Sequence, residues 1–115
     1  MSECIFCKIA KKEIKSQFVL ENEELIAIKD IQPHAPVHLL VIPKQHIPTL
    51  NDVGPKDLPL IGQMFAASQR LARDFKIADS GYRAVFNCNR EGGQTVFHLH
   101  LHLLGGRQLG GGMVG

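Results

Sequence analysis

The stretch His98-Leu99-His100-Leu101-His102 holds three of the six histidines of this chain, each separated from the next by a leucine. Apolar residues extend the pattern on both sides, with Val96-Phe97 before it and Leu103-Leu104 after it. Strict alternation over this length predicts a β-strand with unlike faces, because successive side chains of a strand point to opposite sides. The imidazoles then share one face at a spacing of roughly 6.6 Å. The residues expected to face the core are Phe97, Leu99, Leu101 and Leu103.

Such a row of imidazoles has several interpretations. An affinity tag is contiguous and terminal, and this stretch is neither. A chance row of exposed histidines is one alternative, and a three-histidine metal site is another. The third alternative is nucleophilic catalysis, in which one imidazole attacks while its neighbours fix its tautomer and bind the charge that develops.

The segment that leads into the strand favours nucleophilic catalysis. Its Gly92-Gly93 pair allows the backbone to approach a ligand closely and to turn N–H groups toward an anion. Gln94 and Thr95 add side-chain donors. A glycine pair alone usually marks a plain turn, but here donors for an oxyanion and a nucleophile arrive on one short segment.

Length and composition indicate a single domain over residues 1–115. The chain is 44% hydrophobic and 21% charged, which is ordinary for a globular protein. Its net charge of +2 gives no basic field, so we expect no nucleic-acid partner and no membrane partner. No signal peptide is apparent, so we expect a cytoplasmic protein with reduced cysteines. A glycine-rich tail from about residue 105 is expected to be mobile.

Periodicity predicts a short helix over 4–12, strands over 18–21, 25–28 and 37–42, a long helix from about 57–59 to 75, and strands over 82–87 and 96–104. This order indicates an α+β fold, with an antiparallel sheet, one long helix and a short N-terminal helix. Pro59 fits only the first turn of the long helix. The apolar face expected for that helix consists of Leu58, Ile61, Met64, Phe65, Leu71 and Phe75.

The stretch from Gly92 to Arg107 resembles the signature of the histidine triad (HIT) family, and in particular its Hint branch of purine nucleoside phosphoramidases. The segments 4–9 and 30–44 are also similar to the opening segment and the central strand of that family, so the likeness extends over nearly the whole chain. The ending Gly105-Gly106-Arg107 points to the Hint branch, because the dinucleoside-polyphosphate hydrolase branch typically has a proline before that arginine.

The resemblance implies a HIT-like homodimer that cleaves the P–N bond of adenosine or guanosine 5′-phosphoramidates through a covalent nucleotidyl-histidine, with no cofactor needed for catalysis. It makes His100 the nucleophile, assigns phosphoryl contacts to His38 and His102, and gives His98 a supporting role. The nucleotide contacts that it implies are Ile5, Phe6, Ile9, Ile28, Asp30, Ile31, His38, Asn87, Gly93, Gln94, Thr95, His100 and His102.

Several of these residues have a simpler interpretation. Asp30 precedes a proline turn, where an aspartate commonly bonds its own backbone; the resemblance instead makes it a partner of the ribose hydroxyls. A buried histidine such as His38 is often only a satisfied core residue. The isoleucines and Phe6 are core residues by default, whereas the resemblance places them in an apolar slot for the purine base. Ile28 stands where the Hint branch often has an aromatic residue.

Cys4 and Cys7 form a Cys-x2-Cys pair. Some members of the wider family bind structural zinc with such a pair, a later histidine and the first histidine of the triad. Here that set is Cys4, Cys7, His46 and His98, whose two sulfurs and two nitrogens suit a tetrahedral ion. The alternative is that both cysteines are ordinary packing residues.

Three other functions stay open. A dinucleoside-polyphosphate hydrolase has the same nucleophile but a different leaving group. A nucleotidyl transferase passes the nucleotide to an acceptor other than water. A non-catalytic purine-nucleotide-binding regulatory protein binds nucleotide without turnover.

Overall fold

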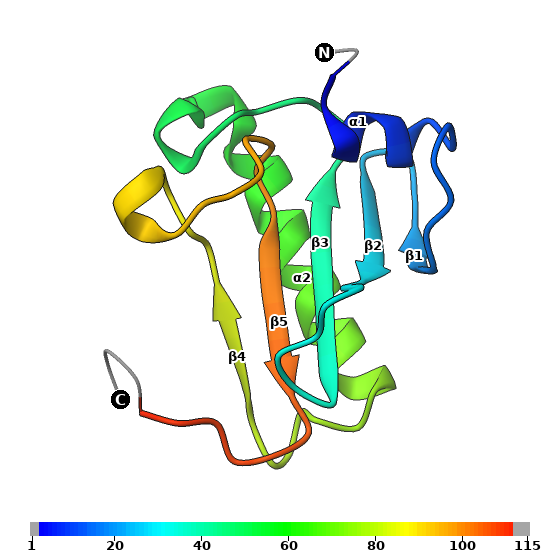
Figure 1. The fold of residues 1–115 in the computed structure, drawn as a ribbon, viewed down its shortest axis with the longest axis vertical. Coiled ribbons are helices and arrows are strands. Elements are labelled where there is room, and N and C mark those ends of the chain that lie inside the picture. The colour runs from blue at the N-terminus through cyan, green and yellow to red at the C-terminus, as the bar shows by residue number, and fades with distance from the viewer. Residues whose placement is uncertain (1–2, 112–115) are drawn as a thin grey trace.

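The computed structural model describes residues 3–111, which form an antiparallel sheet with a helix against each face (Figure 1). The strand order is β1-β2-β3-β5-β4. The helices are α1 (Ile5–Ala10) and α2 (Leu58–Asp74). The strands are β1 (Phe18–Glu21), β2 (Leu25–Lys29), β3 (Val37–Pro43), β4 (Tyr82–Val85) and β5 (Leu101–Gly105). The expected α+β order and the antiparallel sheet are confirmed.

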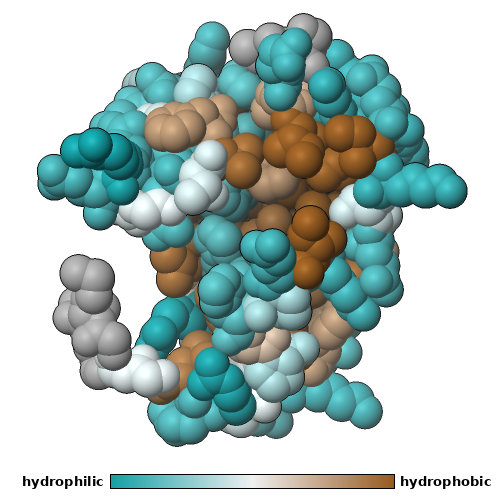
Figure 2. Space-filling model, viewed as in Figure 1, coloured by the Kyte–Doolittle hydropathy of each residue, from teal (hydrophilic) through white to brown (hydrophobic). Residues whose placement is uncertain are grey.

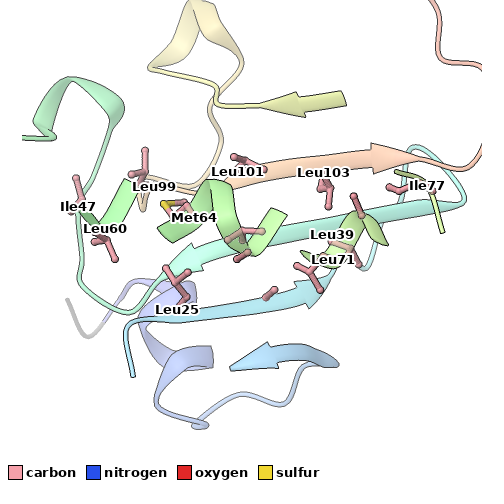
Figure 3. Packing of buried hydrophobic residues seen from close by; sticks show 14 residues of the cluster. Leu25, Leu39, Ile47, Leu60, Met64, Leu71, Ile77, Leu99, Leu101 and Leu103 are labelled. Carbon is pink, nitrogen blue, oxygen red and sulfur yellow. The ribbon is translucent and has the colours of Figure 1, made fainter. Parts of the chain in front are cut away.

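The main core lies between the sheet and α2. Alternate residues of the central strands point to this side, and Leu39 of β3 pairs in register with Leu103 of β5. Figure 3 shows Leu71 of α2 beside these leucines and Met64 of α2 further along the same cluster. All four side chains are almost completely buried. Removing this much apolar surface from water is the main force that holds the helix on the sheet.

A smaller apolar cluster covers part of the opposite face of the sheet. The residues between those of the main core point to this side, and they include Ile26 and Ile28 of β2 and Leu40 of β3. Phe6 and Ile9 of α1 pack on them. The short helix therefore covers one end of this face and leaves the rest of it open.

The histidine-rich strand is shorter than the alternation predicts. Strand β5 begins at Leu101, because the preceding chain leaves the sheet and the Leu99 amide donates to Ile47 O at 2.7 Å. The alternation of burial persists, since Leu99 faces the main core as expected. Phe97 does not: it is 47% exposed, so its predicted place in the core is wrong.

Helix α2 has the expected bounds, and Pro59 lies in its first turn. The predicted apolar face is wrong at two positions, because Leu58 is 60% exposed and Phe65 is 53% exposed. The stripe that faces the sheet consists of Leu60, Met64, Ala67, Ser68, Leu71 and Ala72. Leu58 and Phe65 therefore leave an apolar surface on the outer side of the helix.

Gly105 is the buried last residue of β5, and the glycine-rich tail expected from about residue 105 follows it. After it, Gly106 turns the chain with a φ of +96°. Residues 112–115 of this tail lie outside the described residues. Within residues 3–111, neither helix has the length and apolar character that crossing a membrane requires.

Candidate active site

A cleft of about 740 Å³ opens on the face of the sheet opposite α2. Figure 2 shows this face hollowed, with apolar surface gathered in its upper part. The strand register places His102 of β5 between Leu40 of β3 and Val85 of β4, and all three line the cleft. The predicted nucleotide contacts that line it are Ile5, Phe6, Ile9, Ile28, Asp30, Ile31, His38, Asn87, Gly93, Thr95, His100 and His102.

The tautomer of His100 follows from a backbone contact. Its Nδ1 lies 2.7 Å from the carbonyl oxygen of His98. A carbonyl only accepts, so Nδ1 carries the proton and donates, and Nε2 keeps its lone pair. Burial lowers the pKa of His100, which keeps the ring neutral near pH 7. His100 is therefore a neutral imidazole with one free nitrogen in the cleft, as a nucleophile requires.

His38 and His102 form a hydrogen-bonded pair across β3 and β5. The backbone N–H of His34 donates to Nδ1 of His38 at 3.0 Å, so the proton of neutral His38 is on Nε2. That Nε2 lies 3.0 Å from Nδ1 of His102. His102 accepts there and so carries its own proton on Nε2. Burial, followed by the neighbouring His100 and His38, lowers the pKa of His102 to about 4.

Asp30 makes a local turn bond and also lines the cleft, so neither of the two interpretations offered by the sequence is excluded. Its Oδ1 accepts from the backbone N–H of Gln32 at 2.9 Å, which is the local turn bond. Its Oδ2 lies 3.3 Å from Nε2 of His38, and the residue lines the cleft. A turn bond thus holds one oxygen, and the carboxylate still presents acceptors to the cleft.

His98 lies outside the cleft that holds His100 and His102. Its side chain is completely buried, and its Nε2 donates to Pro43 O at 2.7 Å. The Nδ1 lone pair consequently points the other way, toward the sulfurs of Cys4 and Cys7 at 3.2 and 3.6 Å. Burial lowers the pKa of His98, so the ring is neutral. Its carbonyl, rather than its ring, orients His100.

The four predicted zinc ligands lie together. Nδ1 of His46 is 3.2 Å from Nδ1 of His98 and 3.4 Å from Sγ of Cys7. A tetrahedral zinc with bonds of about 2.3 Å to sulfur and about 2.05 Å to nitrogen separates two nitrogens by about 3.3 Å and a nitrogen from a sulfur by about 3.6 Å. These nitrogen–nitrogen and nitrogen–sulfur distances match those of a tetrahedral zinc site. Burial raises the pKa of Cys7, so metal binding here would displace a proton.

Asp30, His38 and His102 also bring three potential ligand atoms close together. Their hydrogen bonds argue against a metal, because Nε2 of His38 must carry a proton while Nδ1 accepts from His34. A metal at that nitrogen would require the bond from His34 to break. We assign this cluster to hydrogen bonding.

The apolar end of the cleft lies between α1 and β2. Phe6 is buried, and its ring packs edge-on against His100 with centroids 5.0 Å apart. Ile9 and Ile28 continue the same surface. Ile5 and Ile31 are 45% and 90% exposed, so they form its rim. The slot is thus an apolar surface open to solvent on one side, which suits a flat ring.

The backbone N–H groups of the glycine pair are bonded within their own loop, although Gly93 lines the cleft. The backbone N–H groups of Gly92, Gly93 and Gln94 donate to Asn89 O, Arg90 O and Asn89 O, within the loop that contains the 3₁₀ turn Arg90–Gly92. The Gln94 side chain is buried and donates to Pro48 O at 2.9 Å and to Val96 O at 3.0 Å. Gln94 therefore holds the loop together and does not line the cleft.

Several residues that line the cleft were not expected there. The most informative are His34, Arg83, Val85 and Leu104. Alternation along β4 was the available signal, because Arg83 and Val85 share a face that continues to Asn87. His34 carried no such signal, since its place depends on the fold of the loop before β3.

The chain is similar to known proteins over nearly its whole length. A family model described as "Scavenger mRNA decapping enzyme C-term binding" matches residues 3–113. The purine nucleoside phosphoramidase of Escherichia coli K12 is 46% identical over 108 residues, which cover 94% of this chain and 91% of that protein. A HIT-like protein of Chlamydia pneumoniae is 52% identical over 106 residues, covering 92% and 96%.

Solved structures share the fold over nearly the whole chain. A HIT family hydrolase from Clostridium thermocellum has a TM-score of 0.95 and 45% identity, and the match covers 99% of each chain. A HIT family hydrolase from Legionella pneumophila has a TM-score of 0.91 and 50% identity, with 92% of this chain and 95% of that chain covered.

Proposed function

Because the chain belongs to the histidine triad family, we propose that it is a hydrolase that cleaves the P–N bond of purine nucleoside 5′-phosphoramidates. The observation that carries this proposal is the tautomer of His100. Its proton is held at Nδ1 by the His98 carbonyl, and its Nε2 lone pair is free in a cleft that also holds an apolar slot and a carboxylate.

The lining of the cleft supports one direction of nucleotide binding in this proposal. The purine ring lies on the apolar surface of Phe6, Ile9 and Ile28, and Asp30 accepts from the ribose hydroxyls. A carboxylate suits a vicinal diol because it offers two acceptor oxygens. In this arrangement the α-phosphorus lies next to Nε2 of His100, which lines the same cleft.

The reaction has two displacements at phosphorus. In the first, Nε2 of His100 attacks, the P–N bond to the leaving amine breaks, and the amine takes a proton through the Thr95 hydroxyl from solvent. The ring becomes a cationic nucleotidyl-imidazolium, which the His98 carbonyl stabilises at Nδ1–H. In the second, water attacks the phosphorus, the bond from phosphorus to Nε2 breaks, and a proton goes to solvent. Nε2–H of His102 donates to a phosphoryl oxygen in both steps.

Turnover of paired substrates tests the proposal. Adenosine 5′-phosphoramidate and a diadenosine polyphosphate are compared on purified protein, with and without an added acceptor alcohol. We expect fast release of AMP from the phosphoramidate in water alone. Preference for the polyphosphate would favour the alternative hydrolase, and dependence on the acceptor would favour a transferase. Nucleotide binding without turnover would favour the non-catalytic, regulatory nucleotide-binding protein.

We also propose a structural zinc ion at Cys4, Cys7, His46 and His98. Zinc there would join α1 to the start of the triad segment, and it would supply folding energy rather than chemistry. Elemental analysis of untagged protein and thermal melting with a chelator test this. We expect the wild type and Cys88→Ser to bind zinc and Cys7→Ser to lose it. Metal-free wild type that melts together with Cys7→Ser would contradict it.

A homodimer across α2 and β4 is a further proposal for this protein. Strand β4 is at the edge of the sheet, and the exposed Phe65 of α2 lies beside Phe86 with ring centroids 6.4 Å apart. An exposed strand edge next to exposed aromatic surface is typical of an interface. Light scattering is expected to give twice the chain mass for the wild type and a monomer for Phe65→Glu. A monomeric wild type would contradict it.

A further inference from the structure

Both backbone groups of His34 are held in place, one from each side. Its N–H donates to Nδ1 of His38 at 3.0 Å, and its carbonyl accepts from Nη2 of Arg107 at 3.0 Å. Arg107 belongs to the tail that follows β5, so a segment far along the chain fixes the loop before β3. His34 lines the cleft, and its ring lies beside that of His38 with centroids 5.7 Å apart.

The position of Arg107 is itself determined by the backbone. The preceding Gly106 adopts a φ of +96°, and a Cβ built on it would meet Cβ of Pro36 at 3.0 Å. A residue with a side chain would be strained there and would crowd the loop. Nη1 of Arg107 donates to Gln108 O at 2.9 Å, which turns the guanidinium so that Nη2 faces His34.

The contacts continue from His34 to the reacting atoms. Because His34 N–H occupies Nδ1 of His38, the proton of His38 is on Nε2, where Nδ1 of His102 at 3.0 Å and Oδ2 of Asp30 at 3.3 Å both accept. His102 consequently carries its proton on Nε2. A neutral histidine presents either a donor or a lone pair at a given nitrogen, so this chain of bonds decides which one a phosphoryl oxygen meets.

We propose that Arg107 is a positioning residue that, through the backbone of His34 and the ring of His38, keeps His102 as an Nε2–H donor toward the phosphate. The proposal rests on the hydrolase function above. Without Arg107, the His34 loop is free to shift and Nδ1 of His38 loses its fixed donor. His38 then samples the Nδ1–H tautomer, in which its Nε2 accepts from His102, although Oδ2 of Asp30 at 3.3 Å still favours a proton on Nε2. That exchange turns the His102 nitrogen in the cleft from a donor into a lone pair, which repels the phosphoryl oxygen.

Steady-state kinetics of Arg107→Ala, Arg107→Lys and Arg70→Ala test the proposal. Loss of a donor to a developing anion lowers kcat by about 10²–10³, so partial loss through a shifted tautomer is expected to lower it by about tenfold. KM should change less than about twofold, because the base and ribose contacts are elsewhere. Lysine restores part of kcat, since it donates one bond to His34 O. Arg70 is an exposed residue of α2 paired with Asp74, so Arg70→Ala is the matched loss of one arginine.

An unchanged kcat in Arg107→Ala, or a fall confined to KM, would overturn the proposal. So would a fall no larger than that of Arg70→Ala. The melting temperature of each variant is measured alongside, and Arg107 is exposed, so folding is expected to survive.

A second measurement does not depend on turnover. In protein with ¹⁵N-labelled histidine, the nitrogen shifts and the ring couplings report which nitrogen carries the proton. We expect Nε2–H for both His38 and His102 in the wild type, and a mixture of tautomers for both in Arg107→Ala. A wild type with His38 protonated at Nδ1, or tautomers unchanged in the variant, would overturn the positioning role even if phosphoramidase activity is present. Conversely, the expected ¹⁵N shifts in a protein without phosphoramidase activity would contradict only the hydrolase function and would leave the positioning role of Arg107 supported.

Discussion

Acidification should destabilise this protein through His102, and the size of the effect follows from its surroundings. Burial, with His100 and His38 next in importance, lowers the pKa of His102 to about 4 from an ordinary value near 6.5. The unfolded chain therefore binds more protons than the folded chain between these two values. Stability rises with pH where the unfolded state binds more protons, so the contribution of His102 is complete above about pH 6.5 and is lost progressively as the pH falls toward 4.

The magnitude comes from integrating over that window. A shift of about 2.5 pKa units corresponds to roughly 3 kcal/mol in full, of which up to about 2 kcal/mol is lost between pH 7.5 and pH 5.0. Burial also lowers the pKa of His38 and His100, which adds loss in the same direction. The free energy of unfolding of the wild type consequently falls more steeply with decreasing pH than the contribution of His102 alone.

Urea unfolding at pH 7.5, 6.0 and 5.0 measures this, with His102→Gln as the matched variant. Glutamine keeps polar atoms near the same place but does not titrate. We expect the variant to lose less free energy of unfolding than the wild type on going to pH 5.0, by about 2 kcal/mol at most. Parallel curves for the two proteins would contradict this expectation, because His102 would then titrate alike in the folded and unfolded states.

Two other substitutions test separate parts of the account. Asp30→Ala should weaken AMP binding by about 1.5–3 kcal/mol but leave binding of the 2′,3′-dideoxy nucleotide nearly unchanged, because a charged acceptor matters only when the diol is present. Equal losses in calorimetry would reduce Asp30 to its turn bond with Gln32. Gly105→Ala should lower the free energy of unfolding by about 1–3 kcal/mol, since its new Cβ would lie 2.9 Å from Cδ1 of the buried Ile77. Gly110→Ala, with no heavy atom within 4 Å of its new methyl, is the control, and matching urea midpoints would show that the β5 end tolerates a side chain.

Alternation predicted the part of the site that belongs to regular strands. It placed Leu101 and Leu103 in the core and His102 on the opposite face, because the side-chain period of a strand is fixed. It did not predict the exposure of Phe97 or the separation of His98 from the cleft. Both depend on where the chain leaves the sheet before Leu101, and a loop contact sets that point.

The remaining features depend on contacts that no local pattern encodes. The glycine loop was expected to offer its N–H groups to an anion, but those groups satisfy carbonyls within the loop itself. The bond between Arg107 and His34 joins residues 73 positions apart, so it becomes visible only in the folded chain. The cysteine pair was predicted only in part. The sequence indicated residue types that could bind a metal, but only the fold shows that Cys7, His46 and His98 lie close together.

The most direct test of the central claim is to trap the nucleotide on His100 in a single turnover. Wild type and His100→Ala are mixed with adenosine 5′-phosphoramidate, quenched rapidly in base and digested, and the peptides are read by mass spectrometry. We expect one nucleotidyl group on the peptide that contains His100 and none on the variant, whose rate falls by several orders of magnitude while AMP still binds. A variant that turns over near the wild-type rate, or an adduct on another residue, would contradict it.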